Sequence, residues 1–185
     1  MVTMKKFSYQ PRKLEELLLL VAELSADDPS FGKTKLNKIL FYIDFFAYGH
    51  FGKPVTGATY QHRPYGPVPR EIVSARDTLV DQGAVDLARQ DRFGYAQERL
   101  TSLRSPDLSL FDQAELNLIR DVITALWTKN GVEASEASHR EIGWRITSDG
   151  QAIPYEAVFV SNRAMTADDV RRGQEVHRTL AGATL

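Results

Sequence analysis

The sequence contains no cysteine among its 185 residues. This absence excludes disulfide frameworks, catalysis by a cysteine thiolate and zinc sites with cysteine ligands. A chain without cysteine fits a reducing compartment, so we expect a cytoplasmic protein.

An excess of either charge is also missing. The sequence has 23 basic and 24 acidic residues, which gives a formal net charge of -1. Such a balance provides no general attraction to nucleic acid or to an anionic membrane. The longest apolar run, LLLLVA at residues 17–22, is far shorter than the ~20 residues that span a bilayer, and residues 1–13 lack the apolar core of a signal peptide. We therefore expect no membrane partner and no nucleic-acid partner.

Sequence motifs for metal, phosphate and nucleophilic chemistry are missing too. No HExxH, GxxxxGKS, GxxxxGKT or GxSxG motif is present, and no GxGxxG lies between a predicted strand and a helix. The histidines at positions 50, 62, 139 and 177 include no pair at the i, i+4 spacing of helical metal ligands. We therefore expect no metal, no cofactor and no catalytic site. A small enzyme that brings Asp44, His62 and His139 into one pocket stays open as an alternative.

The residues that are present suit a globular protein. Hydrophobic residues make up 43% and charged residues 25% of the chain, which is ordinary for a protein with a buried core. No repeat, low-complexity tract or linker interrupts the sequence, so we expect a single domain over residues 1–185. The predicted fold class is mainly α (α+β), with a helical core of five to six helices and a small antiparallel β element.

Apolar periodicity and turn residues predict the elements of the N-terminal half. A helix is expected after Pro11, because one helical face then carries Leu14, Leu17, Leu18, Val21 and Leu24. A second helix is expected from about residue 34 to 48, apolar nearly all round and therefore buried, with a glycine cap at position 49 or 52. A third helix follows the prolines at 67 and 69 and ends at Gly83, and residues 84–102 are predicted to form a β-hairpin that turns at DRFG.

Capping boxes are predicted to begin three helices of the C-terminal half, at Asp112, Ser138 and Thr166. The first of these helices is expected to end near residues 130–131, the second to cover HREIGWR, and the third to run through about residue 180. The segment IPYEAVFV, between the last two, is predicted to be a short strand or extended segment.

Charges on the second predicted helix allow two interpretations each. Lys33, Lys35 and Lys38 could form a phosphate site at the helix N-terminus, or a solvated face whose aliphatic stems lie along apolar surface. We expect the solvated face. Asp44 stands among aromatic residues and would have a disturbed pKa if it were buried; we expect instead that it lies on a polar edge or bonds a tyrosine or an arginine.

The segment YQHRPYGPVPREI, residues 60–72, joins aromatic rings, cations and three prolines. One interpretation is a partner-binding surface, because Tyr and Arg are frequent hot spots of interfaces and a stiff backbone loses little freedom on binding. The other is a tight loop in which Tyr65 packs into the core, and both stay open here. In the first interpretation the partner-binding residues are Tyr60, His62, Arg63, Tyr65 and Arg70.

The stretch KTKLNKILFYIDFFAYGHFGKPVTGATYQHRPYGPVPREI, residues 33–72, resembles the core of the Panacea domain, the SocA-like antitoxin family. The resemblance consists of a Lys-Leu-x-Lys-Leu-hydrophobic-Tyr helix, a Gly-x-Pro-hydrophobic-x-Gly segment and a Tyr-Gly-Pro-hydrophobic turn. It is strong over residues 14–83, and ASEASHREIGW adds a looser match to a Ser-x-x-Ser/Thr-His segment that ends in Trp. The matching positions are Lys35, Leu36, Lys38, Ile39, Leu40 and Tyr42, then Gly52, Pro54, Val55 and Gly57, then Tyr65, Gly66, Pro67 and Val68, and finally Ser135, Ser138, His139 and Trp144.

The resemblance implies a mainly helical fold with a small sheet, and an antitoxin, which is a protein that neutralises a toxin by direct protein–protein binding. The partner is then a cognate toxin protein, usually encoded beside it in a bacterium or a phage, and the family is not known for enzymes. A proteolytic adaptor that delivers the toxin to a protease is an alternative, and a homodimer stays open. We take residues 14–83 as the Panacea-like core and expect residues 84–185, the β-hairpin and the C-terminal helices, to set the choice of partner.

Overall fold

The computed structural model describes residues 7–92, 95–160 and 166–182. These residues form seven α-helices, two 3-10 helices and two small antiparallel sheets, so the prediction of a mainly α fold with a small antiparallel β element is confirmed. In chain order the elements are α1 (Pro11–Leu24), α2 (Lys33–Phe51), β1 (Tyr60–Gln61), β2 (Val68–Pro69), α3 (Ile72–Asp81), β3 (Val85–Arg92), β4 (Tyr95–Ser102), η1 (Leu108–Leu110), α4 (Gln113–Leu126), α5 (Gly131–His139), α6 (Ile142–Arg145), η2 (Tyr155–Phe159) and α7 (Ala167–Gly182).

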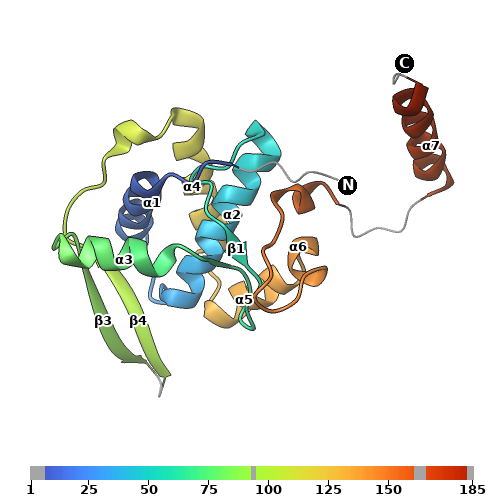
Figure 1. The fold of residues 1–185 in the computed structure, drawn as a ribbon. Helices are drawn as coiled ribbons and strands as arrows, with labels where there is room; N and C mark the ends of the chain where they lie inside the picture. The colour runs from blue at the N-terminus through green and yellow to red at the C-terminus, as the bar shows by residue number, and fades with distance from the viewer. Residues whose placement is uncertain (1–6, 93–94, 161–165, 183–185) are drawn as a thin grey trace.

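Helix α2 lies in the middle of the fold, in contact with α4, α5, β2 and η2 (Figure 1). Its sequence explains this position, because Leu36, Ile39, Leu40 and Ile43 form one stripe and aromatic residues fill much of the rest. The helix extends three residues past the predicted end at Tyr48 and is closed by Gly52, whose φ of 71° lies in the left-handed region.

Helices α1, α3 and α4 complete the hydrophobic core. The predicted apolar stripe of α1 is buried except for Leu24, which is partly buried, and Leu19 and Leu20 beside the stripe are buried as well. Helix α1 therefore contacts neighbours on several sides, namely α3, α4 and β4.

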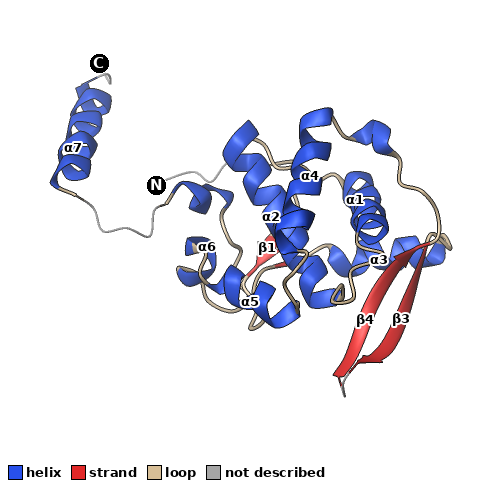
Figure 2. Ribbon diagram, turned by 180° about the vertical axis from the view of Figure 1, so that it is seen from behind, coloured by secondary structure: helices blue, strands red, loops and turns tan. Residues whose placement is uncertain are grey.

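Two antiparallel pairs make up the β structure. Tyr60 of β1 pairs with Pro69 of β2, and a single bridge joins Gln61 to Ala152. The predicted hairpin is confirmed as β3 and β4, and its turn residues 93–94 lie outside the described residues. Figures 1 and 2 show that this hairpin extends away from the helices.

The predicted end of the fourth helix is wrong. Helix α4 begins at the expected capping box of Asp112 and Glu115, but it ends at Leu126. Asn130, expected near the end of α4, instead forms a second capping box with Glu133 and begins α5.

The predicted helix start at Ser138 is also wrong, because Ser138 lies inside α5 and donates to the carbonyl of Ser135 over 2.7 Å.

The segment IPYEAVFV forms the 3-10 helix η2 over most of its length and contains no named strand. Helix α7 begins after Thr166 as predicted, and both views draw it apart from the other helices (Figures 1 and 2).

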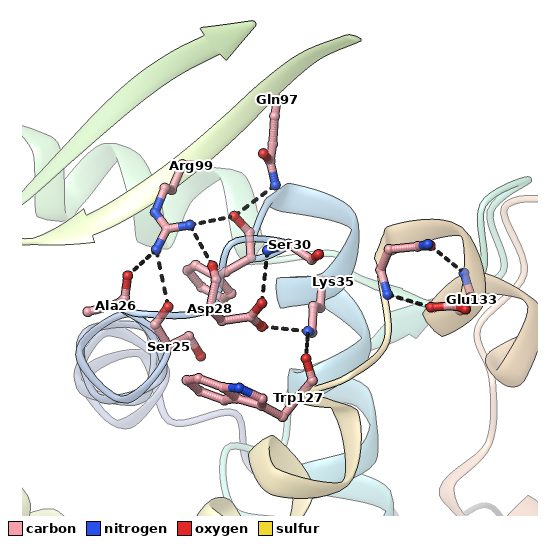
Figure 3. Close-up of polar contacts among 11 residues, drawn as sticks. Ser25, Ala26, Asp28, Ser30, Lys35, Gln97, Arg99, Trp127 and Glu133 are labelled. Carbon is pink, nitrogen blue, oxygen red and sulfur yellow. Dashed lines mark hydrogen bonds and ion pairs between the residues drawn. The ribbon is translucent and has the colours of Figure 1, made fainter. Parts of the chain in front are cut away.

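Buried polar contacts hold the loop between α1 and α2 (Figure 3). Lys35 donates to Asp28 over 2.5 Å and to the carbonyl of Trp127 over 3.1 Å. Lys35 is 1% and Asp28 is 2% exposed, so this ion pair is shielded from water. The expected solvated face is therefore wrong for Lys35 and for Lys38, which is also 1% exposed, whereas Lys33 is exposed.

Arg99 of β4 fastens the hairpin to the same loop (Figure 3). Its guanidinium donates to carbonyls at the end of α1 and in the loop that follows. The acceptors are Ser25 (3.2 Å), Ala26 (2.5 Å), Asp28 (2.9 Å) and Phe31 (3.3 Å). A cation beside these carbonyls also interacts favourably with the C-terminal end of the α1 dipole.

We predict that Lys35→Met lowers the free energy of unfolding by about 3 kcal/mol, because it leaves the Asp28 carboxylate buried without its counter-ion. Urea denaturation measures the change. The double variant Lys35→Met/Asp28→Asn should regain most of the loss, since no buried charge then remains. If the single and double variants were equally unstable, the unpaired Asp28 carboxylate would not be the cause of the lost free energy of unfolding.

Candidate functional site

The segment between β1 and β2, residues 62–67, forms a tight turn that we call the Tyr65 turn. The pairing of Tyr60 with Pro69 holds its ends together, and the Gly66 N–H donates to the Arg63 carbonyl over 2.8 Å. Gly66 has a φ of 94°, a conformation that residues with a Cβ rarely adopt. Gly66 is therefore the residue that allows the chain to reverse here.

Carbonyl groups of the Tyr65 turn accept hydrogen bonds from side chains of three helices, α2, α5 and α6. The bonds are Lys38 Nζ to Pro67 (3.1 Å), Ser135 Oγ to Tyr65 (2.8 Å), Trp144 Nε1 to Arg63 (3.2 Å), and a bond between His139 and the backbone of Pro64. Since each bond fixes a different peptide unit, the backbone of the turn has little freedom left.

Trp144 lies between two histidine rings. Its indole stacks on His62 with ring centroids 4.2 Å apart and on His139 with centroids 4.1 Å apart. The His62 ring is held in turn, because its Nδ1 lies 3.0 Å from the Trp144 carbonyl and 3.2 Å from Thr147 Oγ1. Both faces of the indole are covered, so Trp144 joins the Tyr65 turn to α5 and α6 and leaves no open face for a ligand ring.

Lys38 lies beneath the Tyr65 turn without an ion pair among the described residues, although it is 1% exposed. Burial lowers the pKa of Lys38 to about 7. Burial and, after it, the charge of Lys38 lower the pKa of His139. Gly66 packs directly on this group, since a Cβ at position 66 would lie 2.6 Å from Lys38 Cε and nearer still to Ser138 Oγ.

The outer surface of the turn carries most of the residues predicted to bind a partner. Tyr65 is 76% exposed, so the interpretation in which it packs into the core is wrong. Arg63 has 47% of its side chain exposed, and its Nη1 lies 3.7 Å from Asp149 Oδ1. Arg70 is exposed and His62 is partly buried.

Tyr60 requires a correction, because it lies in the core and offers no surface to a partner. It is 1% exposed, and its hydroxyl donates to Asp44 over 2.9 Å. Asp44 also accepts from the N–H and the hydroxyl of Thr56, over 2.7 and 2.5 Å. The expectation that Asp44 bonds a tyrosine is thus confirmed, but the alternative of a polar edge is wrong, because Asp44 is fully buried. Burial raises its pKa to about 6 even though these hydrogen bonds act to lower it.

The structure does not bring Asp44, His62 and His139 into one open pocket. Asp44 is 0% exposed, and the two histidines lie on opposite faces of Trp144. Over residues 7–92, 95–160 and 166–182, no group of three His, Asp or Glu side chains could hold a metal ion. None of the helices in this part of the chain combines the length and the hydrophobicity that a membrane span requires.

Local sequence patterns did not reveal how the turn is anchored. Ser135, His139 and Trp144 were singled out through the family resemblance, without any indication of what they contact. Thr147 and Asp149 were missed altogether. Thr147 lies 85 positions from His62 along the chain, and neither helical nor strand periodicity reports contacts over such separations.

Comparison with protein-family models gives a match over residues 36–145 to the model described as antitoxin SocA-like, Panacea domain. The matched region contains the Tyr65 turn, the four side chains bonded to its carbonyl groups and the β3–β4 hairpin, whereas Thr147 and Asp149 lie beyond it. Neither curated proteins nor solved structures give a match.

We predict that Gly66→Ala destabilises the protein by about 3 kcal/mol, through backbone strain at positive φ and the clash with Lys38 and Ser138. Gly83→Ala is the matched control, since Gly83 has a φ of 64° and no atom lies within 4 Å of an added Cβ. It should cost only the strain, about 1 kcal/mol. Equal losses in urea denaturation would show that the packing on Gly66 is unimportant.

We predict that the stability of the wild-type protein rises between pH 7 and pH 9 because of Lys38. Its folded pKa of about 7 lies below the ordinary value of 10.5, so in this range the unfolded chain binds more protons and raising the pH favours folding. The contribution is about 2 kcal/mol over these two units. Lys38→Met should lack this rise. Urea denaturation measures the free energy of unfolding of both proteins across this pH range. If it rose equally in both, Lys38 would not be the source of the pH dependence.

Proposed function

The chain belongs to the family of SocA-like antitoxins with a Panacea domain, and from this premise we propose that it neutralises a cognate toxin by binding it directly through the Tyr65 turn. The observation that carries the proposal is the contrast between the two sides of the turn. Its inner side is bonded to three helices, whereas its outer side presents an exposed tyrosine and an exposed arginine.

A rigid turn of this kind favours binding for a physical reason. Association requires flexible side chains and loops to become ordered, and a backbone that is already fixed avoids part of this loss. Tyr65 adds a large planar surface with few rotatable bonds, and Arg63 adds five N–H donors in a planar group. The turn therefore suits a protein surface that offers an apolar pocket for the ring and an acidic group nearby.

Neutralisation by contact implies a stable complex of toxin and antitoxin. Such a complex buries on the order of 1,000 Å² or more, so the Tyr65 turn would form the centre of the interface and Arg70 part of its rim. Contact alone should suppress the toxin, so this protein should still neutralise it in an extract free of proteases. If the toxin stayed active in that extract, neutralisation by contact would be excluded. That outcome would favour delivery of the toxin to a protease.

We predict that Tyr65→Ala weakens binding of the toxin about thirtyfold, equivalent to about 2 kcal/mol, and that Arg63→Ala weakens it about tenfold. Neither change should alter the free energy of unfolding by more than about 0.5 kcal/mol, since both side chains are exposed. Phe51→Ala is the control, because Phe51 is also an exposed ring, at 42%, but lies at the end of α2. Calorimetry or biolayer interferometry with the purified toxin measures the affinities, and wild-type affinity of both turn variants would rule out the turn as the binding surface.

A further inference from the structure

The chain that follows α6 returns along β1 as an extended segment. The Ile153 N–H donates to the Tyr60 carbonyl over 2.8 Å, and the His62 N–H donates to the Gln151 carbonyl over 2.9 Å. The pairing is antiparallel, so β1 has β2 on one edge and this segment on the other. An antiparallel neighbour begins at the end where β1 finishes. The loop of residues 146–150, which we call the Ile146 loop, therefore projects from the same end as the Tyr65 turn.

Several contacts place the Ile146 loop against the first residues of the Tyr65 turn. The Gly150 N–H donates to the His62 carbonyl over 3.0 Å, and His62 Nδ1 lies 3.2 Å from Thr147 Oγ1. Arg63 Nη1 lies 3.7 Å from Asp149 Oδ1. The turn and the loop, which are about 80 positions apart in the sequence, thus form one continuous surface.

The Ile146 loop is held in shape by bonds of its own. Thr147 Oγ1 donates to the Gly143 carbonyl over 2.8 Å, which ties the loop to α6. The Ser148 N–H donates to Gln151 Oε1 over 2.8 Å, and the Gln151 N–H donates to the Ser148 carbonyl over 2.9 Å. A loop fixed in this way loses little conformational freedom when a partner binds.

The outer side of the loop carries an apolar side chain. Ile146 is 60% exposed, although Trp144, two residues before it, is stacked between two histidine rings. Ser148 and Asp149 are exposed as well. A single exposed isoleucine is ordinary on a protein surface, but this one lies in a loop joined to the turn that carries the exposed Tyr65. The two segments together offer a partner two apolar anchors on fixed backbones.

The Ile146 loop begins directly after the region that matches the family model, which ends at residue 145. The Tyr65 turn lies inside that region. The surface at this end of the sheet thus combines a segment that the family model covers with one that it does not. Surface loops vary more than the elements that carry them, so the loop is the part of this surface that is suited to distinguish one partner from another.

We infer that the Ile146 loop is the second half of the toxin-binding surface, and that Ile146 packs against an apolar side chain of the toxin next to the site that takes Tyr65. The inference rests on the proposed function and deepens it, since it takes the toxin as the partner. It narrows the expectation that residues 84–185 set the choice of partner to this loop.

Two substitutions at Ile146 test the anchor through affinity. Ile146→Ala should weaken toxin binding about tenfold, and Ile146→Arg about a hundredfold, because a charge would then face an apolar surface. Leu103→Ala is the matched control, since Leu103 is 61% exposed but follows β4 at the base of the hairpin. It should leave the affinity unchanged. All three variants should keep the wild-type midpoint in urea denaturation, because the side chains are exposed. Wild-type affinity of both Ile146 variants overturns the inference.

The lack of cysteine in this chain allows a second test that maps the contact directly. Ser148→Cys introduces a thiol in the loop, and Ser105→Cys introduces one at an exposed position beyond β4. Alkylation of the full chain, followed by mass spectrometry, should slow at least about tenfold at position 148 when the protein encoded beside this chain is added, and should not change at position 105.

Two results of the alkylation experiment would overturn the inference. One is an unchanged rate at position 148 in a formed complex, since the loop would then lie outside the interface. The other is slowing that follows the chain's own concentration without toxin, which would assign the loop to a second copy.

The affinities separate this inference from the proposed function. If the wild-type chain does not bind the toxin, both fail. If it binds, and Tyr65→Ala loses affinity while the two Ile146 variants do not, only the loop inference fails. Loss of affinity in Ile146→Ala, with wild-type affinity in Tyr65→Ala and Arg63→Ala, would support the loop and remove the turn from the interface.

Discussion

A tight turn leaves backbone carbonyls without partners in a helix or sheet, and those that are shielded from water need donors from elsewhere in the fold. In this protein the donors come from α2, α5 and α6, which are distant in sequence. The Tyr65 turn is therefore the point at which three helices are tied together. The same bonds leave Tyr65 exposed on a backbone that is held from inside, and the proposed binding role depends on this constraint.

Two buried lysines on α2 show how position decides the state of a charge. Lys35 and Lys38 are each 1% exposed and lie three residues apart. Lys35 forms an ion pair with the carboxylate of Asp28. Lys38 donates to the carbonyl of Pro67 instead, and burial lowers its pKa to about 7. The first is a conventional buried ion pair. The second is a donor that keeps its hydrogen bond in either protonation state, so the turn stays anchored on both sides of neutral pH.

The helices and the hairpin could be predicted from the sequence because their signals are local. Apolar spacing predicted α1 and α2, the capping box at Asp112 predicted the start of α4, and the left-handed cap at Gly52 was one of two candidate positions. The errors arose where local signals competed. Asn130 resembled the end of one helix but begins the next, and Ser138 resembled a cap but fills a buried position in α5.

The candidate site was predictable in part. Composition of the segment 60–72 pointed to the exposed Tyr65 and Arg63, but the same reasoning placed Tyr60 on the surface, although alternation along β1 turns its side chain toward Asp44 in the core. The burial of Lys35 and Lys38 was missed, because a lysine on a helix usually reaches water and only the tertiary neighbours decide otherwise. The anchoring contacts of the turn join residues far apart in the chain, which periodicity does not report.

Footprinting of Tyr65 by hydroxyl radicals, with and without the purified toxin, tests the central claim most directly, because the ring is 76% exposed in the free chain. The account predicts that the oxidation rate of Tyr65 falls severalfold in the complex, while that of the exposed Phe51 is unchanged. A complex that forms with the oxidation rate of Tyr65 unaltered would contradict it.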